Sequence, residues 1–255
     1  MELKGSVAIV TGAGRGIGRA VARELARNGA SVVVCSRTEA EISQTASLIE
    51  EEGGVCLPLL ADVSQKDQAK DLVEQTVRRF GAVDILVNNA ARIPVISAVW
   101  EVDPDEWWEE VSVNLRGTML CTRYALPHMM ARNRGVIVNL PGGTSIPGRT
   151  SYCCSKVAVD RLTMLLAKEL SAVNSSVIVF QIGPGLVKTR RTLVEAESAQ
   201  GQRWNPATKR AFEEGRDRPP EECARAVVIL IRNATGEMSG KYFSAQEVLS
   251  SAVSS

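Results

Sequence analysis

The stretch T-G-A-G-R-G-I-G (Thr11–Gly18) directly follows the short apolar run VAIVT (Val7–Thr11). Its glycines Gly12, Gly16 and Gly18 are spaced G-x-x-x-G-x-G, and a helical pattern starts at Gly16. Residues without a Cβ let the backbone approach a pyrophosphate, and a helix N-terminus offers that group free N–H donors and the positive end of a dipole. A glycine-rich turn between a strand and a helix therefore predicts a dinucleotide site.

Outward from this turn, strand-like and helix-like segments alternate along the chain. Strands are expected at residues 7–11, 31–36, 55–62, 84–90, 135–140, 176–182 and 241–245, and helices at 16–28, 39–52, 65–80, 104–133, 152–170 and 219–232. This alternation indicates parallel βαβ units, and the continuously apolar strands indicate burial on both faces. The prediction is one α/β domain over residues 1–255, with a doubly wound parallel sheet of about seven strands and helices on both faces. Ligands bind such sheets at the carboxyl ends of the strands.

Residues 189–218 are the one long segment without a strand, and they are expected to form a substrate loop or lid. The segment is polar and rich in basic residues, which could bind an acidic substrate. Four acidic residues are interleaved with them, which favours the interpretation of a solvated, mobile loop. The basic residues are Arg190, Arg191, Arg203, Lys209, Arg210, Arg216 and Arg218, and the acidic ones are Glu195, Glu197, Glu213 and Glu214.

Composition excludes several classes of function. The 255 residues are 45% hydrophobic and 23% charged with a net charge of +1, so nothing favours binding to nucleic acid or to an anionic membrane. The longest late apolar run, residues 226–231, is too short to span a bilayer, and a cytoplasmic protein is expected. Six cysteines without a C-x-x-C pair and a single histidine, His128, predict no metal site and argue against Ser-His or Cys-His catalysis.

The end of the second predicted strand bears on the choice of nucleotide. An acidic residue there would bind a ribose 2′-OH and favour NAD, but the sequence is Cys35-Ser36-Arg37-Thr38. Arg37 and Arg15 could instead grip a 2′-phosphate, with a further hydrogen bond from Ser36. We therefore favour NADP(H), with NAD(H) possible; the alternative is that Arg37 is only a solvated surface residue.

Five motifs in order closely resemble the short-chain dehydrogenase/reductase family. They are TGAGRGIG, NNAA (Asn88–Ala91), Asn114, YCCSK (Tyr152–Lys156) and PGLVKT (Pro184–Thr189). The resemblance covers nearly the whole chain. It implies a single Rossmann-type domain, hydride transfer with NAD(P)(H) between a carbonyl and an alcohol, a small-molecule substrate, and a homodimer or homotetramer.

The resemblance also implies contacts for each part of the cofactor. They are Gly12, Gly16, Ile17 and Gly18 at the pyrophosphate, Asp62 and Val63 at the adenine, Asn89 and Ala90 beside its ribose, and Pro184, Gly185, Val187 and Thr189 over the nicotinamide. Ala91 stands where the family usually has glycine, a mild departure.

Tyr152 and Lys156 are the predicted centre of the chemistry. Their i, i+4 spacing places both on one helix face. A free tyrosine has a pKa near ~10, and a neighbouring ammonium lowers it, so that tyrosine can exchange a proton with a carbonyl or alcohol oxygen. The resemblance implies that Lys156 also binds the nicotinamide ribose, and that Asn114 holds a water of the proton relay.

A catalytic serine of the family is missing. Counting forward from the fifth predicted strand places it at Gly142, and counting back from Tyr152 places it at Asn139. Three alternatives follow: Thr144 or Ser145 reaches the site, the enzyme works without this hydroxyl, or catalysis is lost and only nucleotide binding remains. Losing one such donor typically costs about 10²–10³ in rate. The expected function is an NADP(H)-dependent oxidoreductase; the alternative is a nucleotide-binding protein that acts through partners with little or no turnover.

Overall fold

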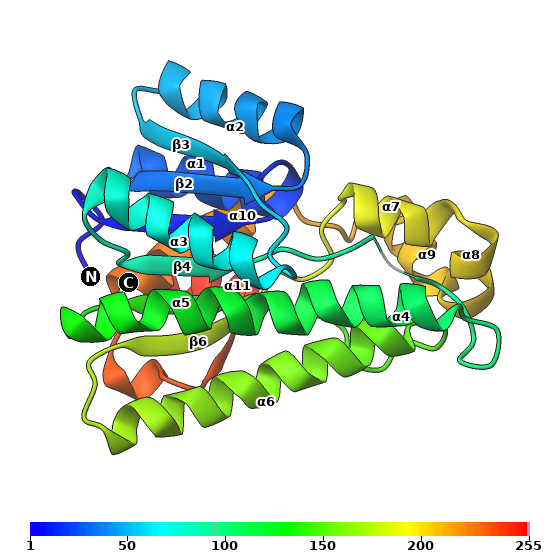
Figure 1. Ribbon diagram of the computed structural model, residues 1–255. Helices are drawn as coiled ribbons and strands as arrows, with labels where there is room; N and C mark the ends of the chain where they lie inside the picture. The colour runs from blue at the N-terminus through cyan, green and yellow to red at the C-terminus, as the bar shows by residue number, and fades with distance from the viewer. Residues whose placement is uncertain (94, 254–255) are drawn as a thin grey trace.

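A computed structural model describes residues 1–93 and 95–253 and confirms the predicted architecture. Seven strands form one parallel sheet in the order β3-β2-β1-β4-β5-β6-β7 (Figure 1). The strands are β1 (Val7–Thr11), β2 (Ser31–Ser36), β3 (Val55–Leu60), β4 (Ile85–Asn88), β5 (Val136–Asn139), β6 (Ile178–Gly183) and β7 (Tyr242–Ser244). The strand order reverses between β1 and β4, where ligands bind in open α/β sheets.

Helices cover both faces of the sheet. The chain contains α1 (Gly16–Arg27), α2 (Glu39–Glu51), α3 (Lys66–Phe80), α4 (Pro104–Val111), the π-helical turn η1 (Ser112–Arg116), α5 (Gly117–Ala131), α6 (Thr150–Ala172), α7 (Arg190–Glu197), α8 (Ala199–Trp204), α9 (Pro206–Glu213), α10 (Pro220–Arg232), the 3₁₀ turn η2 (Gly236–Met238) and α11 (Ala245–Val253). Helices α1, α2, α10 and α11 pack on one face, and α3, α5 and α6 on the other.

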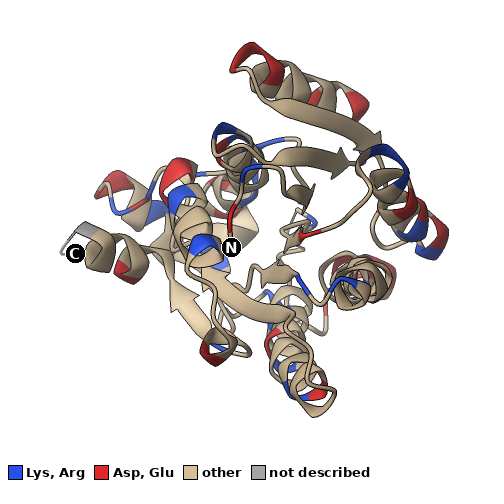
Figure 2. Cartoon of the chain, turned by 90° about the vertical axis from the view of Figure 1, so that its left-hand side faces the viewer, with Lys and Arg blue, Asp and Glu red and all other residues tan. Residues whose placement is uncertain are grey.

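The core is divided between these two faces by the alternation of side chains along each strand. In β1, Ala8 and Val10 pack with α1 and α10, whereas Ile9 packs with α3 and α5. All five residues of β1 are buried, which explains why this strand reads as a continuous apolar run. In Figure 2, charged residues are spread over the outer helices and are almost absent from the strands.

Pro58 lies inside β3, where it removes a backbone donor. The sheet tolerates it because β3 is an edge strand, paired with β2 alone.

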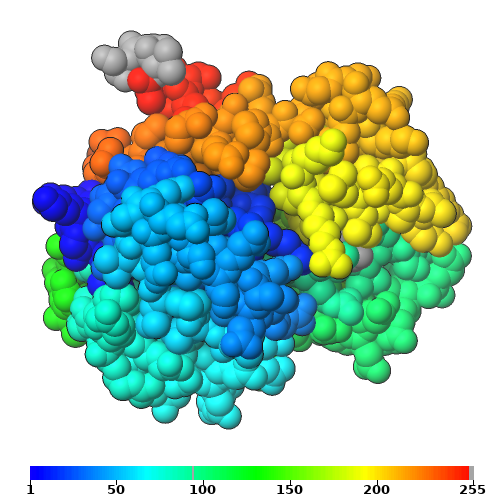
Figure 3. Space-filling view, turned by 90° about the horizontal axis from the view of Figure 1, so that it is seen from above, coloured from blue at the N-terminus to red at the C-terminus, as the bar shows by residue number. Residues whose placement is uncertain are grey.

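The segment expected to be a loop over residues 189–218 contains three short helices, α7, α8 and α9. Its two ends are tied together, because Val187 pairs with Arg218 and the Arg218 N–H donates to the Leu186 carbonyl at 2.8 Å. In Figure 3 the segment, in yellow and light orange, projects beside the N-terminal part of the chain, in blue. We call residues 190–218 the helical lid.

Candidate active site

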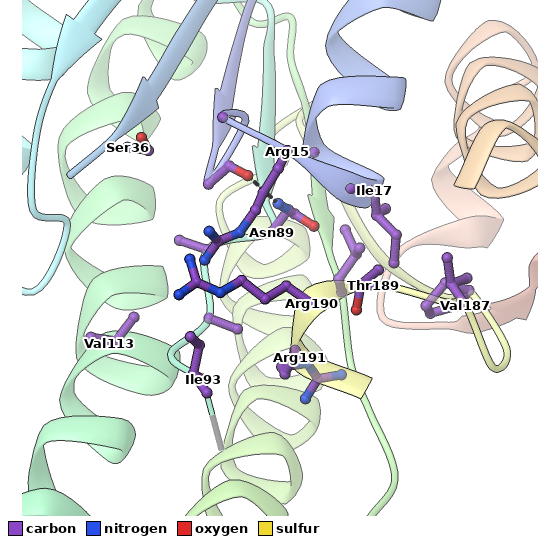
Figure 4. Close-up of a pocket in the computed structure, with 18 of the residues that line it drawn as sticks. Arg15, Ile17, Ser36, Asn89, Ile93, Val113, Val187, Thr189, Arg190 and Arg191 are labelled. Atoms are coloured by element: carbon purple, nitrogen blue, oxygen red, sulfur yellow. Dashed lines mark hydrogen bonds between the residues drawn. The ribbon is translucent and has the colours of Figure 1, made fainter. Parts of the chain in front are cut away.

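A cleft of about 410 Å³ opens at the carboxyl ends of the strands, beside the point where the strand order reverses. Every residue that the sequence predicts at the cofactor lies on its wall: Gly12, Arg15, Gly16, Ile17, Gly18, Ser36, Arg37, Asp62, Val63, Asn89, Ala90, Tyr152, Lys156, Pro184, Gly185, Val187 and Thr189. Figure 4 shows part of this wall, with Arg15 and Arg190 extending into the same part of the pocket. The fold thus brings together segments that are far apart in sequence.

The glycine-rich turn is held against the end of β4. Asn89 Nδ2 donates to the carbonyls of Thr11 at 2.8 Å and Gly12 at 3.1 Å, and Thr11 Oγ1 accepts from the backbone N–H groups of Asn89 and Ala90. Gly12 has φ +63°, and a Cβ there would lie 2.8 Å from Ala90 Cα. The turn therefore requires glycine, and its bare backbone at the start of α1 fits a diphosphate.

The end of β2 gathers charges of both signs. Arg15 forms an ion pair with Glu41 at 2.7 Å, and Arg37 lies 3.9 Å from Asp62 and 3.6 Å from Glu109. Half of the Arg37 side chain is exposed, so its guanidinium is free to meet a ligand. Glu41 is a cleft residue that the sequence did not reveal, because it follows the strand end by several residues and reads as an ordinary helix acid.

Tyr152 and Lys156 lie buried at the inner end of the cleft. Tyr152 is 2% exposed and Lys156 5% exposed, and both project from α6. Lys156 Nζ donates to the Leu140 carbonyl at 2.8 Å, just beyond β5. This hydrogen bond fixes the ammonium close to Tyr152, 5.8 Å from the centre of its ring.

Asn114 lies behind this pair and is not part of the cleft wall. It is fully buried in η1, where the wider π turn interrupts the otherwise continuous helix from α4 to α5. Its Nδ2 donates to Ser155 Oγ at 3.0 Å, and Ser155 Oγ donates in turn to the Tyr152 carbonyl at 2.7 Å. Asn114 therefore contacts the Tyr152 helix through Ser155, and its relay role stays a prediction.

Positive charge dominates the surroundings of the Tyr152 hydroxyl. Burial alone would raise the pKa of Tyr152, but the charges of Arg191, Lys156 and Arg149 together outweigh it and hold that pKa below its ordinary value. Burial also lowers the pKa of Lys156, although the neighbouring Tyr152 opposes the effect. A phenol with a lowered pKa is suited to proton exchange near neutral pH.

Gly142 occupies the place beside the Tyr152 hydroxyl. A Cβ at Gly142 would overlap Tyr152 Oη, so the forward count matches the spatial position. Asn139 is instead buried and hydrogen-bonded, accepting from Asn88 and donating to Thr163. The side chains of Thr144 and Ser145 are exposed and form no hydrogen bond within the described residues, so this conformation does not bring either one to Tyr152.

Two arginines approach the Tyr152 ring instead. The Cζ atoms of Arg149 and Arg191 lie 4.1 Å and 4.5 Å from its centre. The interpretation of residues 189–218 as a solvated, mobile loop is therefore wrong for Arg191, which is half-buried, and for Glu195, which is buried against Arg149. The sequence does contain a signal that this segment is helical: Thr189 and Thr192 cap the N-terminus of α7 and mark where that helix begins.

The comparisons with known proteins point to one family. The family model described as short chain dehydrogenase matches residues 6–199. A short chain dehydrogenase of Pseudocercospora fijiensis is 38% identical over 192 residues, which are 74% of this chain and 62% of that protein. The 3-oxoacyl-acyl-carrier-protein reductase of Thermotoga maritima is 31% identical over 244 residues, 94% of this chain and 96% of that protein.

A solved structure shares the whole architecture. A metagenomic short-chain oxidoreductase in complex with NADP superimposes with a TM-score of 0.77 at 26% identity, covering 95% of this chain and 97% of that one. The fold, the cleft and the family model together define an oxidoreductase of Rossmann type. The chain belongs to the short-chain dehydrogenase/reductase family, as its motifs predicted.

Proposed function

We propose that the protein is an NADP(H)-dependent oxidoreductase that interconverts a carbonyl and an alcohol. The observation that carries the proposal is Tyr152, buried beside Lys156 and two arginines at the inner end of the cleft, with its pKa lowered by their charges. A tyrosine with a lowered pKa at the inner end of the cleft supports this reaction, because it could exchange a proton with a bound carbonyl or alcohol.

In the direction of reduction, Tyr152 gives its hydroxyl proton to the carbonyl oxygen. When bound, the dinucleotide supplies the hydride for the carbon. In the direction of oxidation, the phenolate takes the proton from the alcohol, so oxidation requires a pH above the Tyr152 pKa and reduction favours a pH below it. Lys156 stabilises the phenolate and, from its position on the cleft wall, would also bind the nicotinamide ribose.

The preference for NADP(H) is supported by the residues at the end of β2. Arg37, Arg15 and Ser36 line the cleft there, and guanidinium groups bind phosphate with charge-assisted hydrogen bonds. The structural neighbour in complex with NADP supports the same choice. Glu41 pairs with Arg15 at 2.7 Å, whereas the carboxylates nearest to Arg37 lie at 3.6 and 3.9 Å, so Arg37 is the principal candidate for the 2′-phosphate.

A homodimer or homotetramer in the cytoplasm remains our expectation. Large apolar side chains are exposed on the helices at the front of Figure 1, namely Trp108 of α4, Met119 and Met130 of α5, and Val157, Met164 and Leu165 of α6. Among the residues that the structure describes, no helix is long and apolar enough to cross a bilayer.

Replacing Tyr152 with phenylalanine tests the proposed reaction. Tyr152→Phe removes only the hydroxyl, so we expect NADPH-dependent reduction of a carbonyl panel to fall about 10²–10⁴-fold while NADPH binding persists. Tyr124→Phe on α5 is the matched control and should leave the rate unchanged. Undiminished turnover in Tyr152→Phe would show the mechanism to be wrong. Tight NADPH binding by the unaltered protein without turnover of any carbonyl would instead support the non-enzymatic alternative.

A further inference from the structure

Arg191 is the charged side chain of the helical lid that reaches Tyr152. Its guanidinium carbon lies 4.5 Å from the centre of the Tyr152 ring, and Arg191 also lines the cleft. The position is fixed by the start of α7, where Thr189 caps the helix and Thr192 Oγ1 donates to the Val187 carbonyl at 2.7 Å. The first turn of α7 is therefore anchored to the segment that leads from β6, with Arg191 turned inward.

The other arginine at Tyr152, Arg149, has its charge paired and is not among the residues that line the cleft, although its buried Nε and Nη2 also have no hydrogen-bond partner among the described residues. Arg149 Nη1 forms an ion pair with Glu195 at 2.5 Å, and both side chains are 3% exposed. Arg191 has no ion pair among the described residues, and its buried Nη1 has no hydrogen-bond partner there. A buried guanidinium nitrogen without an acceptor is costly, because the group gives up its water without a replacement. Arg191 therefore offers an unused Nη1 donor and a guanidinium charge without an ion pair of its own close to Tyr152.

Position 142 supplies no hydroxyl, because it is a glycine and the Tyr152 hydroxyl fills the space that a side chain there would need. The family uses a serine hydroxyl there, and this chain has neither the hydroxyl nor room for a Cβ. We propose that Arg191 is a catalytic residue that takes over this task, donating a hydrogen bond from its guanidinium to the substrate oxygen that Tyr152 protonates. This inference rests on the proposed carbonyl–alcohol activity and adds to it the group that stabilises the developing negative charge.

The reaction balances without any proton from Arg191. Hydride from the reduced nicotinamide dinucleotide forms the new C–H bond, and the carbonyl π electrons move to oxygen. That oxygen takes the Tyr152 proton, which gives the alcohol and the oxidised dinucleotide. Arg191 remains protonated throughout, because Tyr152, Glu195 and Glu110 offset the effect of burial and keep its pKa above the ordinary value. It acts only by stabilising negative charge on the substrate oxygen and on the phenolate.

Kinetics of three variants test this role. Arg191→Met removes the charge and the donor with a similar side-chain length, and we expect kcat to fall about 10²–10³-fold with a much smaller change in the Kd of NADPH. Arg191→Lys keeps the charge and should retain more activity than Arg191→Met. Arg210→Met, at an exposed arginine of the same lid, should match the unaltered protein. Full activity in Arg191→Met, or equal losses in Arg191→Met and Arg191→Lys, would overturn the proposal.

A second measurement needs no substrate and therefore separates this inference from the proposed function. The chain has three tyrosines, so the tyrosinate absorbance near ~295 nm of the protein minus that of its Tyr152→Phe variant reports Tyr152 alone. The charges that act on Tyr152 are Arg191 on α7, Lys156 on α6 and Arg149 before α6. The carboxylates Glu110 on α4 and Glu195 on α7 act in turn on these basic groups. Removing Arg191 should move the Tyr152 titration to higher pH. An unchanged titration in Arg191→Met would overturn the proposal whatever the turnover, whereas a shifted titration without turnover of any carbonyl would count against the proposed function alone.

Discussion

At the scale of single residues, the contact between Gly142 and Tyr152 determines what the site tolerates. The Tyr152 hydroxyl occupies the space in which a side chain at position 142 would have to begin. Restoring the serine of the family at this position should therefore damage the site. We expect Gly142→Ser to displace Tyr152, to lower turnover and to destabilise the fold by about 1–3 kcal/mol, the usual cost of overpacking.

The neighbouring glycine provides the control for this substitution. A Cβ at Gly143 would meet only the end of the Ile146 side chain, which can move. Gly143→Ser should therefore keep both its turnover and its unfolding free energy close to those of the unaltered protein. A Gly142→Ser variant that turns over faster than the parent would show that the serine position is open after all.

Whether the role of a residue can be predicted from the sequence depends on how far apart along the chain the two contacting residues lie. Tyr152 and Lys156 were found in sequence because their contact is local, one turn of one helix apart. The contact between Arg191 and Tyr152 joins α7 to α6 across 39 residues of chain, and no spacing rule connects them. Counting residues from β5 and from Tyr152 gave two positions, Gly142 and Asn139, for the missing serine of the family. Only the structure shows how the loop between β5 and α6 runs and which of the two lies beside Tyr152.

At the scale of elements, one buried carboxylate contributes several of the contacts that hold the helical lid to the rest of the domain. Glu195 on α7 pairs with Arg149 just before α6, and its Oε1 also accepts from Asn205 Nδ2 at 2.6 Å and Thr208 Oγ1 at 3.3 Å. One side chain thus joins α7 to the start of α9 and to the N-terminus of the Tyr152 helix. The lid was expected to be mobile because its charges appear balanced and solvated in sequence, but this pair is buried.

Removing the Glu195 charge should loosen the lid and the fold together. Glu195→Gln leaves the buried Arg149 guanidinium without its ion-pair partner, for which we expect a loss of about 3–5 kcal/mol in unfolding free energy. Urea titration followed by circular dichroism measures this loss. Glu213→Gln on α9, where the carboxylate is exposed and 4.0 Å from Lys209, should change the unfolding free energy little. Equal stabilities of the two variants would show that the buried pair does not hold the lid.

Sequence patterns predicted the long helices but not the π turn or the short helices of the lid. The pattern over residues 104–133 predicted one long helix, and the structure places α4, η1 and α5 there as one continuous helical run. The π turn within it has no apolar periodicity of its own, although it carries Asn114. Short helices such as α7 and α8 depend on capping and on packing of the lid, and they are too brief for periodicity to mark them.

At the scale of the whole molecule, the cleft depends on the order of strands in the sheet. Residues 12–18 after β1, 36–37 at the end of β2, 62–63 after β3 and 89–90 after β4 meet at one edge because all these strands are parallel. The alternation of strands and helices predicted that these segments meet at one edge of the sheet. The ordered motifs identified which residues meet there. A dinucleotide bound in this cleft as proposed would therefore bridge the glycine-rich turn, the Tyr152 helix and the lid.

Cofactor binding should therefore stabilise the entire domain, and the effect should depend on the 2′-phosphate. NADPH at 100 times its Kd is expected to add about 2.7 kcal/mol to the unfolding free energy. NADH at the same concentration should add less, because it lacks the phosphate that Arg37 would bind. Arg37→Ala should weaken NADPH binding about 10–100-fold, the equivalent of about 1.4–2.8 kcal/mol, which is the range expected for hydrogen bonds to a charged group, and should leave NADH binding nearly unchanged.

Thermal unfolding with each cofactor measures this difference, and Arg78→Ala on α3 is the matched control. Arg78 is exposed and pairs with Asp71 away from the cleft, so its loss should leave the stabilisation by both cofactors intact. If NADH stabilises the unaltered protein as strongly as NADPH does, the assignment of NADP(H) is wrong. If NADPH is preferred but Arg37→Ala keeps that preference, the 2′-phosphate is bound by other cleft residues, with Arg15 and Ser36 the next to test.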